Sequence, residues 1–543
     1  AVYAHDANGE PYAIAITNAT QPGQSRVIEK GTKNEFYTVN LFSDYSRQLG
    51  DHYFKVMGGF NAEHQNVRTL SAQRDGIIVP DLPTIDTSTE QDVAGGGYNH
   101  WATAGFFGRL NYNYKEKYLL EVNGRYDGTS RFMKDQRWNF FPSFSLGWNV
   151  ARENFWKPLE SVVNQFKLRG SWGELGNQNT SNLYPFYEIL PVKSNSGNWL
   201  VNGGKTNTAD IPSLVSTLLT WERVRSFNVG FDFGAFSNRL TGSFDYFVRK
   251  TVDMVGPAPQ LPLVLGIAPA IVNNADMKSY GFEIELSWRD RIGEVDYGVK
   301  FNLADAQQKV VKYPNTTNAF SDWYAGKMSG EIWGYTSLGI AKTDEEMKEH
   351  LASLPNGGQN QLGNKWGAGD IMYADINGDG KIDGGKGTLA DPGDQRIIGN
   401  STPRYNFGLV LDASYKGFDV SIFFQGVGKR DYAPIVGTNG AVFWGAVNNI
   451  WQSMAMEEHF DYFRPEGHPM GANLNGYYPR PDFTSNKNHQ VQTRYLQDAS
   501  YIRLKNLQIG YTLPKQWINK LHINRCRVYV SGDNLWTGTK IGR

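Results

Sequence analysis

Apolar and polar side chains alternate along much of this chain with a period of two residues. The segment YGFEIELSWRD sets four apolar residues of one parity against two acidic residues of the other, Phe282, Ile284, Leu286 and Trp288 against Glu283 and Glu285. Successive side chains of a β-strand point to opposite faces of the sheet, so this segment predicts a strand with one apolar and one acidic face. Those two faces must meet different surroundings.

About sixteen segments follow the same pattern. Many of them are paired through short turns, as around 115–117 and 416–417, whereas four connections are long, polar and rich in Gly and Asn: 65–99, 176–220, 343–403 and 431–495. Short turns at one end and long extracellular loops at the other are typical of outer-membrane barrels. The pattern therefore predicts an all-β chain that forms a large antiparallel transmembrane β-barrel, with residues 1–543 as one barrel domain.

A soluble β-sandwich or propeller also has alternating strands and is the structural alternative. Three features favour the membrane barrel. The strands reach about ten residues, which is enough to cross a bilayer at a tilt; aromatic residues lie near strand ends, as in an aromatic girdle; and no blade-length repeat is present. In a barrel, Phe282 and Ile284 face lipid, and Glu283 and Glu285 face a wet lumen.

Composition narrows the function classes. The 543 residues include Gly 59, Tyr 29, Phe 30 and Trp 15, which favour strands and tight turns. Lys+Arg 54 balance Asp+Glu 54, so net charge gives no argument for nucleic acid as a partner. A single cysteine, Cys526, excludes an internal disulfide and a Cys-rich metal cluster. No apolar run has the length of a membrane helix, and no signal peptide is visible at the N-terminus.

Several strings are more specific than the alternation. GFFGRLNYNYKEKYLLEVNGRYDGTSRF, WNFFPSFSLGWNVARENFW and FKLRGSWGELGNQ lie between Gly105 and Gln178. NNADMKSYGFEIELSW, GDIMYADINGDGKID, IIGNSTPRYNFGLVLDASYKGFDVSIFFQG, ASYIRLKNLQIGYTLP and VYVSGDNLW follow along the chain. From about Phe36 to Trp536 the sequence closely resembles the barrel region of SusC/RagA-type TonB-dependent transporters of Bacteroidetes outer membranes.

The resemblance implies a 22-stranded outer-membrane barrel whose lumen holds a plug. It implies active import of oligosaccharides or peptides, a SusD-like surface lipoprotein as lid, and energy from the TonB system through a plug and TonB box outside this chain. It implies a transporter and no catalytic residues. About sixteen strands cannot close a 22-stranded barrel, and an open edge in lipid is costly, so we expect a barrel portion that is incomplete at both ends and lacks the plug domain.

The string DINGDGKID is the sharpest local motif. Oxygen-bearing side chains alternate in it around a glycine, as in the first nine positions of an EF-hand-type calcium loop. The predicted Ca²⁺ ligands are Asp375, Asn377, Asp379, the Lys381 carbonyl and Asp383. Position twelve is Lys386 instead of glutamate, and the family resemblance implies Asp394 as the returning carboxylate. The alternative is a loop held by Asx turns without an ion.

Aromatic residues in the long connections are the candidate substrate contacts, because flat rings cover an apolar sugar face while amides pair with hydroxyls. They are Trp323, Tyr324, Trp333, Trp366, Trp444 and Trp451. Packing of the loops on one another, or contact with the lipoprotein lid, is an equally good interpretation of these rings.

Two rival functions remain open at this point. One is a SusC-like structural subunit of a larger outer-membrane assembly without transport activity. The other is a secreted carbohydrate-active β protein that uses a carboxylate pair such as Glu283 and Glu285. No hydrolase or metalloprotease motif supports the second. Neither the neutral charge nor the strand pattern distinguishes glycan from peptide as the substrate.

Overall fold

The computed structural model describes residues 2–5, 11–15, 25–79, 81–90, 92–180, 182–212, 214–255, 261–262, 264, 266–267, 269–435, 437–445, 456–482, 486–519 and 522–541. One antiparallel sheet of 14 strands dominates this part of the chain, and its strands follow one another in chain order from β3 to β26. We call this sheet the wall. The pattern predicted about sixteen strands, and the described residues place 14 of them in the wall.

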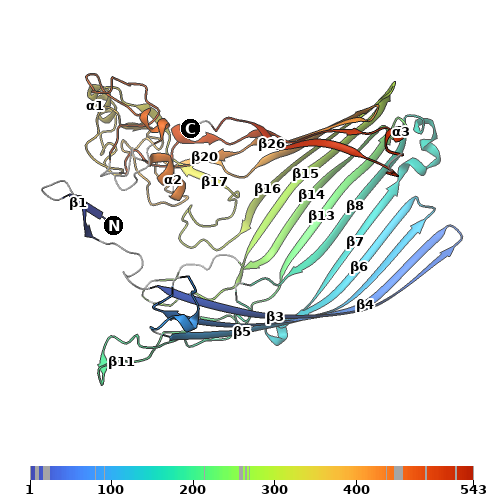
Figure 1. Cartoon of the computed structure of the whole chain (residues 1–543), viewed down its shortest axis with the longest axis horizontal. Helices are drawn as coiled ribbons and strands as arrows, with labels where there is room; N and C mark the ends of the chain where they lie inside the picture. Colours follow the sequence, from blue (N-terminus) through green and yellow to red (C-terminus); the bar gives the residue numbers. More distant parts are fainter. Residues whose placement is uncertain are drawn as a thin grey trace.

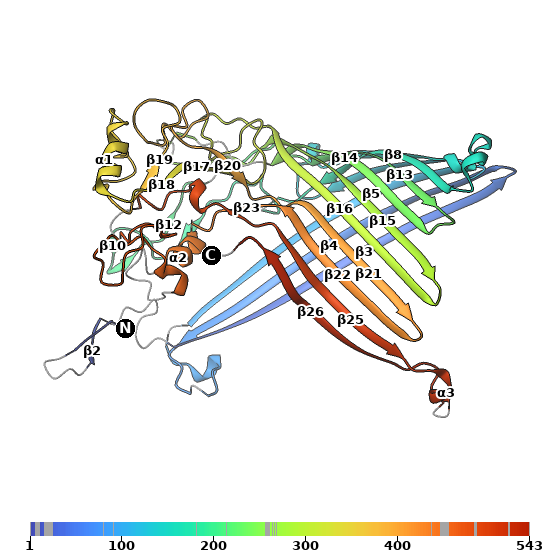
Figure 2. The same cartoon turned by 90° about the horizontal axis from the view of Figure 1, so that it is seen from above.

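The wall strands are β3 (Arg26–Leu49), β4 (His52–Asp75), β5 (Asp92–Tyr114), β6 (Tyr118–Thr129), β7 (Trp138–Asn149), β8 (Val163–Asn177), β13 (Glu222–Ala235), β14 (Leu240–Val255), β15 (Asn273–Ile292), β16 (Val295–Lys312), β21 (Arg404–Tyr415), β22 (Phe418–Lys429), β25 (Tyr501–Thr512) and β26 (Arg527–Thr539). Most are long enough to cross a bilayer at a tilt. The wall curls into an open trough (Figures 1 and 2).

Cross-strand register separates the two faces as the alternation predicted. Phe244 lies opposite Ile284, which lies opposite Leu303, so the apolar residues of β14, β15 and β16 form a continuous row. The neighbouring row joins Glu285 to Asn302. A shift of one residue would exchange these faces. The apolar rows of adjacent strands therefore merge into one outward band, and the polar rows merge on the inner face.

Connections differ strongly between the two ends of the wall. At one end the strands are joined by short segments such as 50–51, 115–117 and 293–294. At the other end the connections 313–403 and 430–500 lie together, and 178–221 also leaves the wall at this end but is separate from them in Figure 1 (Figures 1 and 2). We call 313–403 and 430–500 the loop assembly. Long loops of outer-membrane barrels face the cell exterior, which assigns the loop assembly to that side.

The connections carry short elements. The strands are β1 (Val2–His5), β2 (Pro11–Ala15), β9 (Val192–Lys193), β10 (Leu200–Val201), β11 (Gly204–Lys205), β12 (Thr208–Ala209), β17 (Glu331–Gly334), β18 (Ser337–Ile340), β19 (Ile371–Tyr373), β20 (Arg396–Asn400), β23 (Asp431–Tyr432) and β24 (Gln497–Asp498). The α-helices are α1 (Asp344–Ala352), α2 (Gly437–Trp444) and α3 (Lys515–Ile518). Short 3₁₀ helices lie at Ile85–Thr87, Lys134–Gln136, Val150–Arg152, Asn154–Leu159, Glu457–Phe460 and Thr493–Tyr495. Within the described residues, no helix combines the length and apolarity that a membrane-spanning helix requires.

Two predicted loop boundaries are wrong. The segment 65–99 is mostly strand, because β4 pairs with β3 as far as Asp75 and with β5 from Asp92, which leaves only 76–91 as the connection. The glycines at 95–97 lie inside the connection predicted at 65–99, but they pair with β4 in the antiparallel ladder. The connection predicted at 343–403 begins earlier, at 313, because β16 ends at Lys312.

Candidate functional site

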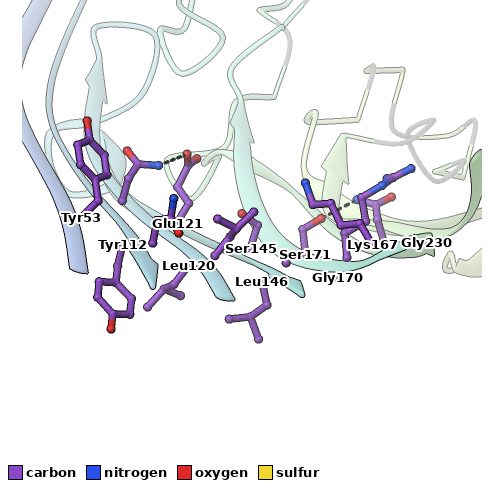
Figure 3. Close-up of a pocket in the computed structure, with 16 residues that line it drawn as sticks. Tyr53, Tyr112, Leu120, Glu121, Ser145, Leu146, Lys167, Gly170, Ser171 and Gly230 are labelled. Atoms are coloured by element: carbon purple, nitrogen blue, oxygen red, sulfur yellow. Dashed lines mark hydrogen bonds between the residues drawn. The ribbon is translucent and has the colours of Figure 1, made fainter. Parts of the chain in front are cut away.

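The inner face of the wall is lined with polar and charged side chains. A hollow of about 450 Å³ lies against β5, β6, β7 and β8. There, Glu121 accepts hydrogen bonds from Asn111 Nδ2 at 2.6 Å and from Asn123 Nδ2 at 2.9 Å. Figure 3 shows Glu121 and Lys167 on one side of the strands and Tyr112 and Leu146 on the other. The strand alternation thus places the charged and amide side chains on one side, and aliphatic and aromatic side chains such as Leu146 and Tyr112 on the other.

Opposite charges are paired across neighbouring strands. Arg169 on β8 contacts Asp232 on β13 at 3.1 Å and Asp245 on β14. Lys300 contacts Glu285 at 2.6 Å. The Glu283–Glu285 pair considered for glycosidase chemistry therefore lies among these cross-strand ion pairs, because Glu285 is paired with Lys300. These contacts form a polar surface suited to solvated solutes, since each charge has a nearby counter-charge.

The loop assembly has a hydrophobic core of its own. Its buried residues come from both long connections: Tyr335, Leu354, Ile371, Tyr373, Ile382, Ile435, Phe443, Trp444, Tyr478 and Tyr495. Tyr373 and Tyr495 are 0% exposed. Burial raises the pKa of the Tyr495 hydroxyl. The two connections are therefore packed together like a small soluble domain instead of projecting separately.

A buried ionic cluster joins the same two connections. Asp370, 0% exposed, accepts hydrogen bonds from Arg480 Nη2 at 2.6 Å, from Lys487 Nζ at 3.0 Å and from Asn488 Nδ2 at 3.0 Å. Lys487 is itself only 1% exposed. Sequence reasoning missed this cluster, because its members lie more than 100 positions apart and no local motif joins them. It fixes the position of one loop relative to the other.

Three of the predicted substrate contacts lie together in 313–403. Trp333 stacks on Phe320 with ring centroids 4.5 Å apart. Trp323 contacts Tyr313 at 5.9 Å between ring centroids. The Tyr324 hydroxyl donates to Glu331 at 2.5 Å, and its pKa is raised by burial and by that carboxylate. All three predicted rings are partly exposed, so contact with a solute remains a prediction.

The other predicted rings have different surroundings. Trp444 is 3% exposed and belongs to the loop core, which is the loop packing that the sequence analysis gave as the equal alternative to substrate contact. Trp366 is partly buried against the same core, and the Lys487 ammonium group lies 5.1 Å from its ring centroid. Trp451 lies outside the described residues.

The predicted calcium loop is held by its own hydrogen bonds. Asp375 accepts from the Gly378 and Gly380 amides at 2.7 and 2.8 Å. Asn377 Oδ1 accepts from the Asp379 amide at 3.0 Å, and Asp379 Oδ1 from the Lys381 amide at 3.2 Å. Gly380 has φ of +78°, which a residue with a side chain rarely adopts. These Asx turns are the alternative that the sequence left open.

A lysine ammonium group stands among the predicted ligands. Lys381 Nζ pairs with Asp383 and lies 3.8 Å from Asp379, and the ammonium group keeps the pKa of Asp383 below its usual range. Asp394 is 0% exposed and accepts from the Ile376 and Asp383 amides at 2.7 and 2.9 Å; burial raises its pKa. Among the described residues, no three acidic, His or Cys side chains gather as metal ligands do. An ion would have to displace the ammonium group.

Comparisons with known proteins agree with this architecture. A family model described as TonB dependent receptor-like, beta-barrel matches residues 2–535. TonB-dependent receptor P3 of Formosa agariphila is 28% identical over 533 residues, covering 92% of this chain and 48% of that protein. TonB-dependent receptor SusC of Bacteroides thetaiotaomicron is 24% identical over 495 residues, covering 88% of this chain and 44% of that protein. The chain therefore spans about half the length of the curated relatives it matches.

Solved structures show the same fold. The structure titled RagAB peptide transporter superposes with a TM-score of 0.76 and 19% identity, covering 96% of this chain and 54% of the matched chain. The RagAB peptide importer in its open-open state gives a TM-score of 0.74. With the family match, this confirms the resemblance predicted from the sequence. The chain belongs to the TonB dependent receptor-like β-barrel family of outer-membrane proteins, and it is similar to SusC in sequence and to the RagAB transporter in fold.

Proposed function

We propose that this chain forms the wall of an outer-membrane channel that imports oligosaccharides or peptides. The observation that carries the proposal is the ion-paired inner face, with Arg169 between Asp232 and Asp245 and Lys300 on Glu285. Such a surface suits the passage of hydrated solutes, whereas the outward apolar band suits lipid.

The proposed partners follow from the family. A SusD-like lipoprotein covers the loop assembly as a lid, and the TonB system supplies energy through parts outside this chain. The structure titled RagAB peptide transporter supports peptides as one of the two proposed substrate classes. The partly exposed Trp323, Tyr324 and Trp333 provide flat rings at the exterior end. We assign no catalytic role to any residue.

Uptake by the native protein in its own outer membrane tests this proposal. We expect cells that carry it to accumulate a labelled oligosaccharide or a labelled peptide, and to stop when the proton gradient is dissipated. The double substitution Trp323→Ala and Trp333→Ala should raise the half-saturating concentration on the order of 10-fold, because a buried stacking ring contributes roughly 1 kcal/mol or more. Uptake that is the same without the protein, for both classes, would contradict the proposal.

We also propose that the 375–394 loop binds Ca²⁺ as a brace. Its support is the alternation of Asp375, Asn377, Asp379 and Asp383 with a turn at Gly380. Binding moves the Lys381 ammonium group away and uses oxygens now engaged in Asx turns. Metal analysis of the native protein before and after chelation tests it, with Asp375→Ala as the variant and Asp210→Ala, in the loop 178–221, as the control. Equal calcium content in the two variants contradicts the brace.

A further inference from the structure

A row of basic side chains crosses the wall near the loop end. Arg225 on β13 lies opposite Lys250 on β14, Lys250 opposite Lys278 on β15, and Lys278 opposite Lys309 on β16. Alternation puts Lys250 on the same face as Val248 and Lys278 on the same face as Tyr280. This is the outward face. We call Lys250, Lys278 and Lys309 the lysine row.

On β14 and β15 the lysine row lies at one edge of the apolar band, whereas on β16 the outward residues just below Lys309 are Gln307 and the Arg404-paired Asp305. Leu240, Trp288 and Val299 form a register-paired row near the short-turn end, and each member of the lysine row lies ten positions further along the same strand. Ten residues at ~3.3 Å each, tilted by ~40°, rise about 25 Å, the height of the lipid-facing band of an outer-membrane barrel. The lysine row therefore sits where the outer-leaflet headgroups begin.

The neighbouring arginines have counter-charges within the chain. Arg225 pairs with Glu174 at 2.9 Å, and Arg223 pairs with Asp253 at 3.2 Å. Asp276, two positions from Lys278, accepts from the backbone amide of Asp253 at 3.0 Å. The carboxylates around the lysine row are therefore already engaged with other donors.

The lysine row itself lacks such partners. Across the described part of the chain, no carboxylate lies within 4.0 Å of Lys250, Lys278 or Lys309. Lys278 instead places its ammonium group 5.1 Å from the ring centroid of Tyr280. Like charges directly opposite one another destabilise a sheet pair. Three adjacent uncompensated cations therefore call for an anion from outside the chain.

We propose that the lysine row binds the phosphate groups of an anionic glycolipid in the outer leaflet. Cross-strand side chains start about 5 Å apart, so the three ammonium groups can converge on one phosphate or share two. Directly below, Val248 on β14 and Tyr280 on β15 offer a surface for the acyl chains, and Gln307 is their neighbour on β16. The inference rests on the outer-membrane position of the wall and is independent of the imported substrate.

Lipid binding to the native protein purified in detergent tests the proposal. Native mass spectrometry with a diphosphorylated lipid A should show tight binding to the wild type. The triple variant K250Q/K278Q/K309Q should bind on the order of 100-fold more weakly, because each basic residue near an anionic surface contributes roughly a five-fold factor. The variant K250R/K278R/K309R should retain binding. K205Q/K342Q/K348Q, which changes the charge equally on exposed loop residues, should match the wild type.

Two further probes define the ligand. Dephosphorylated lipid A should bind the wild type as weakly as diphosphorylated lipid A binds K250Q/K278Q/K309Q. Millimolar inorganic phosphate should leave the binding of diphosphorylated lipid A to the wild type unchanged. Equal binding of phosphorylated and dephosphorylated lipid A would overturn the proposal, because the lysines would then be solvated and would not contact the phosphate groups. Full competition by inorganic phosphate would also overturn it, since the row would then be a simple anion site.

Discussion

The wall and the loop assembly bury their apolar residues in opposite ways. In the wall, Tyr246, Leu286 and Val299 are 39%, 37% and 37% exposed, because their partner is the surrounding lipid. In the loop assembly, Ile371 and Tyr373 are 0% exposed and pack against residues of another connection. Apolar side chains are therefore removed from water by the membrane in the wall and by an internal core in the loop assembly.

This difference teaches where each region obtains its stability. The wall depends on strand register, since backbone groups in lipid must be satisfied by neighbouring strands. The loop assembly depends on close packing and on a buried charge cluster, as a soluble domain does. Damage to one region should therefore leave the other largely intact. Three substitutions test that separation, and a fourth, in the connection 178–221, gives the reference for a small effect.

The largest effect is expected for Asp370→Asn. This change leaves Lys487, 1% exposed, and Arg480 without their shared carboxylate, and breaking a buried ion pair costs about 3–5 kcal/mol. Hydrogen exchange should show early opening of residues 313–403 and 430–500, while the strands keep their protection. Equal loss of protection in the wall would show that the two regions are one cooperative unit.

The next effect belongs to the wall. Ile284→Arg places a charge on the lipid-facing side near the middle of β15, at a cost of about 2–4 kcal/mol. Glu283→Arg is the matched control, because the adjacent residue faces the polar inner side. Urea titration of the protein in lipid vesicles should shift for the first variant only. Comparable destabilisation by both variants would mean that the two faces are not distinct.

Acid should weaken the loop assembly selectively. Burial beside Trp444 lowers the pKa of His489 to about 4, so the opened loops bind a proton more readily than the packed ones. Stability of the assembly should therefore be full above pH 6.5 and fall by up to about 3 kcal/mol as the pH drops to 4. Protection of the loop assembly from protease, measured across this pH range, should decrease toward low pH in the wild type but not in His489→Gln. A slope unchanged by the substitution would assign it to another group.

The smallest effect is expected for Asp210→Asn. Asp210 pairs with Lys193 at 2.6 Å, but both side chains are more than 40% exposed. Exposed pairs contribute about 0–1 kcal/mol because water and salt screen them. Thermal unfolding should be nearly unchanged, in contrast to Asp370→Asn. A loss above 2 kcal/mol would mean that the loop 178–221 is packed more tightly than its exposure indicates.

The wall could be predicted from the sequence because its rule is local. A membrane-spanning strand requires only alternation of apolar and polar residues. The side-chain chemistry of Phe282 and Glu283 and their positions in the alternation therefore indicate which face of the sheet each occupies. The same local rule failed at Gly95–Gly97, where pairing with β4 overrides the turn preference of glycine. The ends of a strand depend on pairing with neighbouring strands, and this pairing cannot be deduced from the sequence of one segment.

The loop assembly could not be predicted in the same way. Asp370 meets Lys487 across 117 positions, and nothing near either residue in the sequence indicates the other. Trp444 lies in a polar connection of the sequence, which suggested a surface contact. In the structure it is a core residue, because segments far away in the sequence pack around it. Local motifs such as DINGDGKID predicted the turn chemistry there, but not the burial of Asp394.

The most direct test of the account labels β15 one position at a time. Nitroxide side chains introduced singly at 282, 283, 284, 285 and 286, in a background without Cys526, are measured in lipid vesicles for collisions with oxygen and with a water-soluble nickel chelate. The account predicts that 282, 284 and 286 favour oxygen, whereas 283 and 285 favour the chelate. Uniform accessibility along the strand, or the reversed alternation, would contradict the assignment of the two faces.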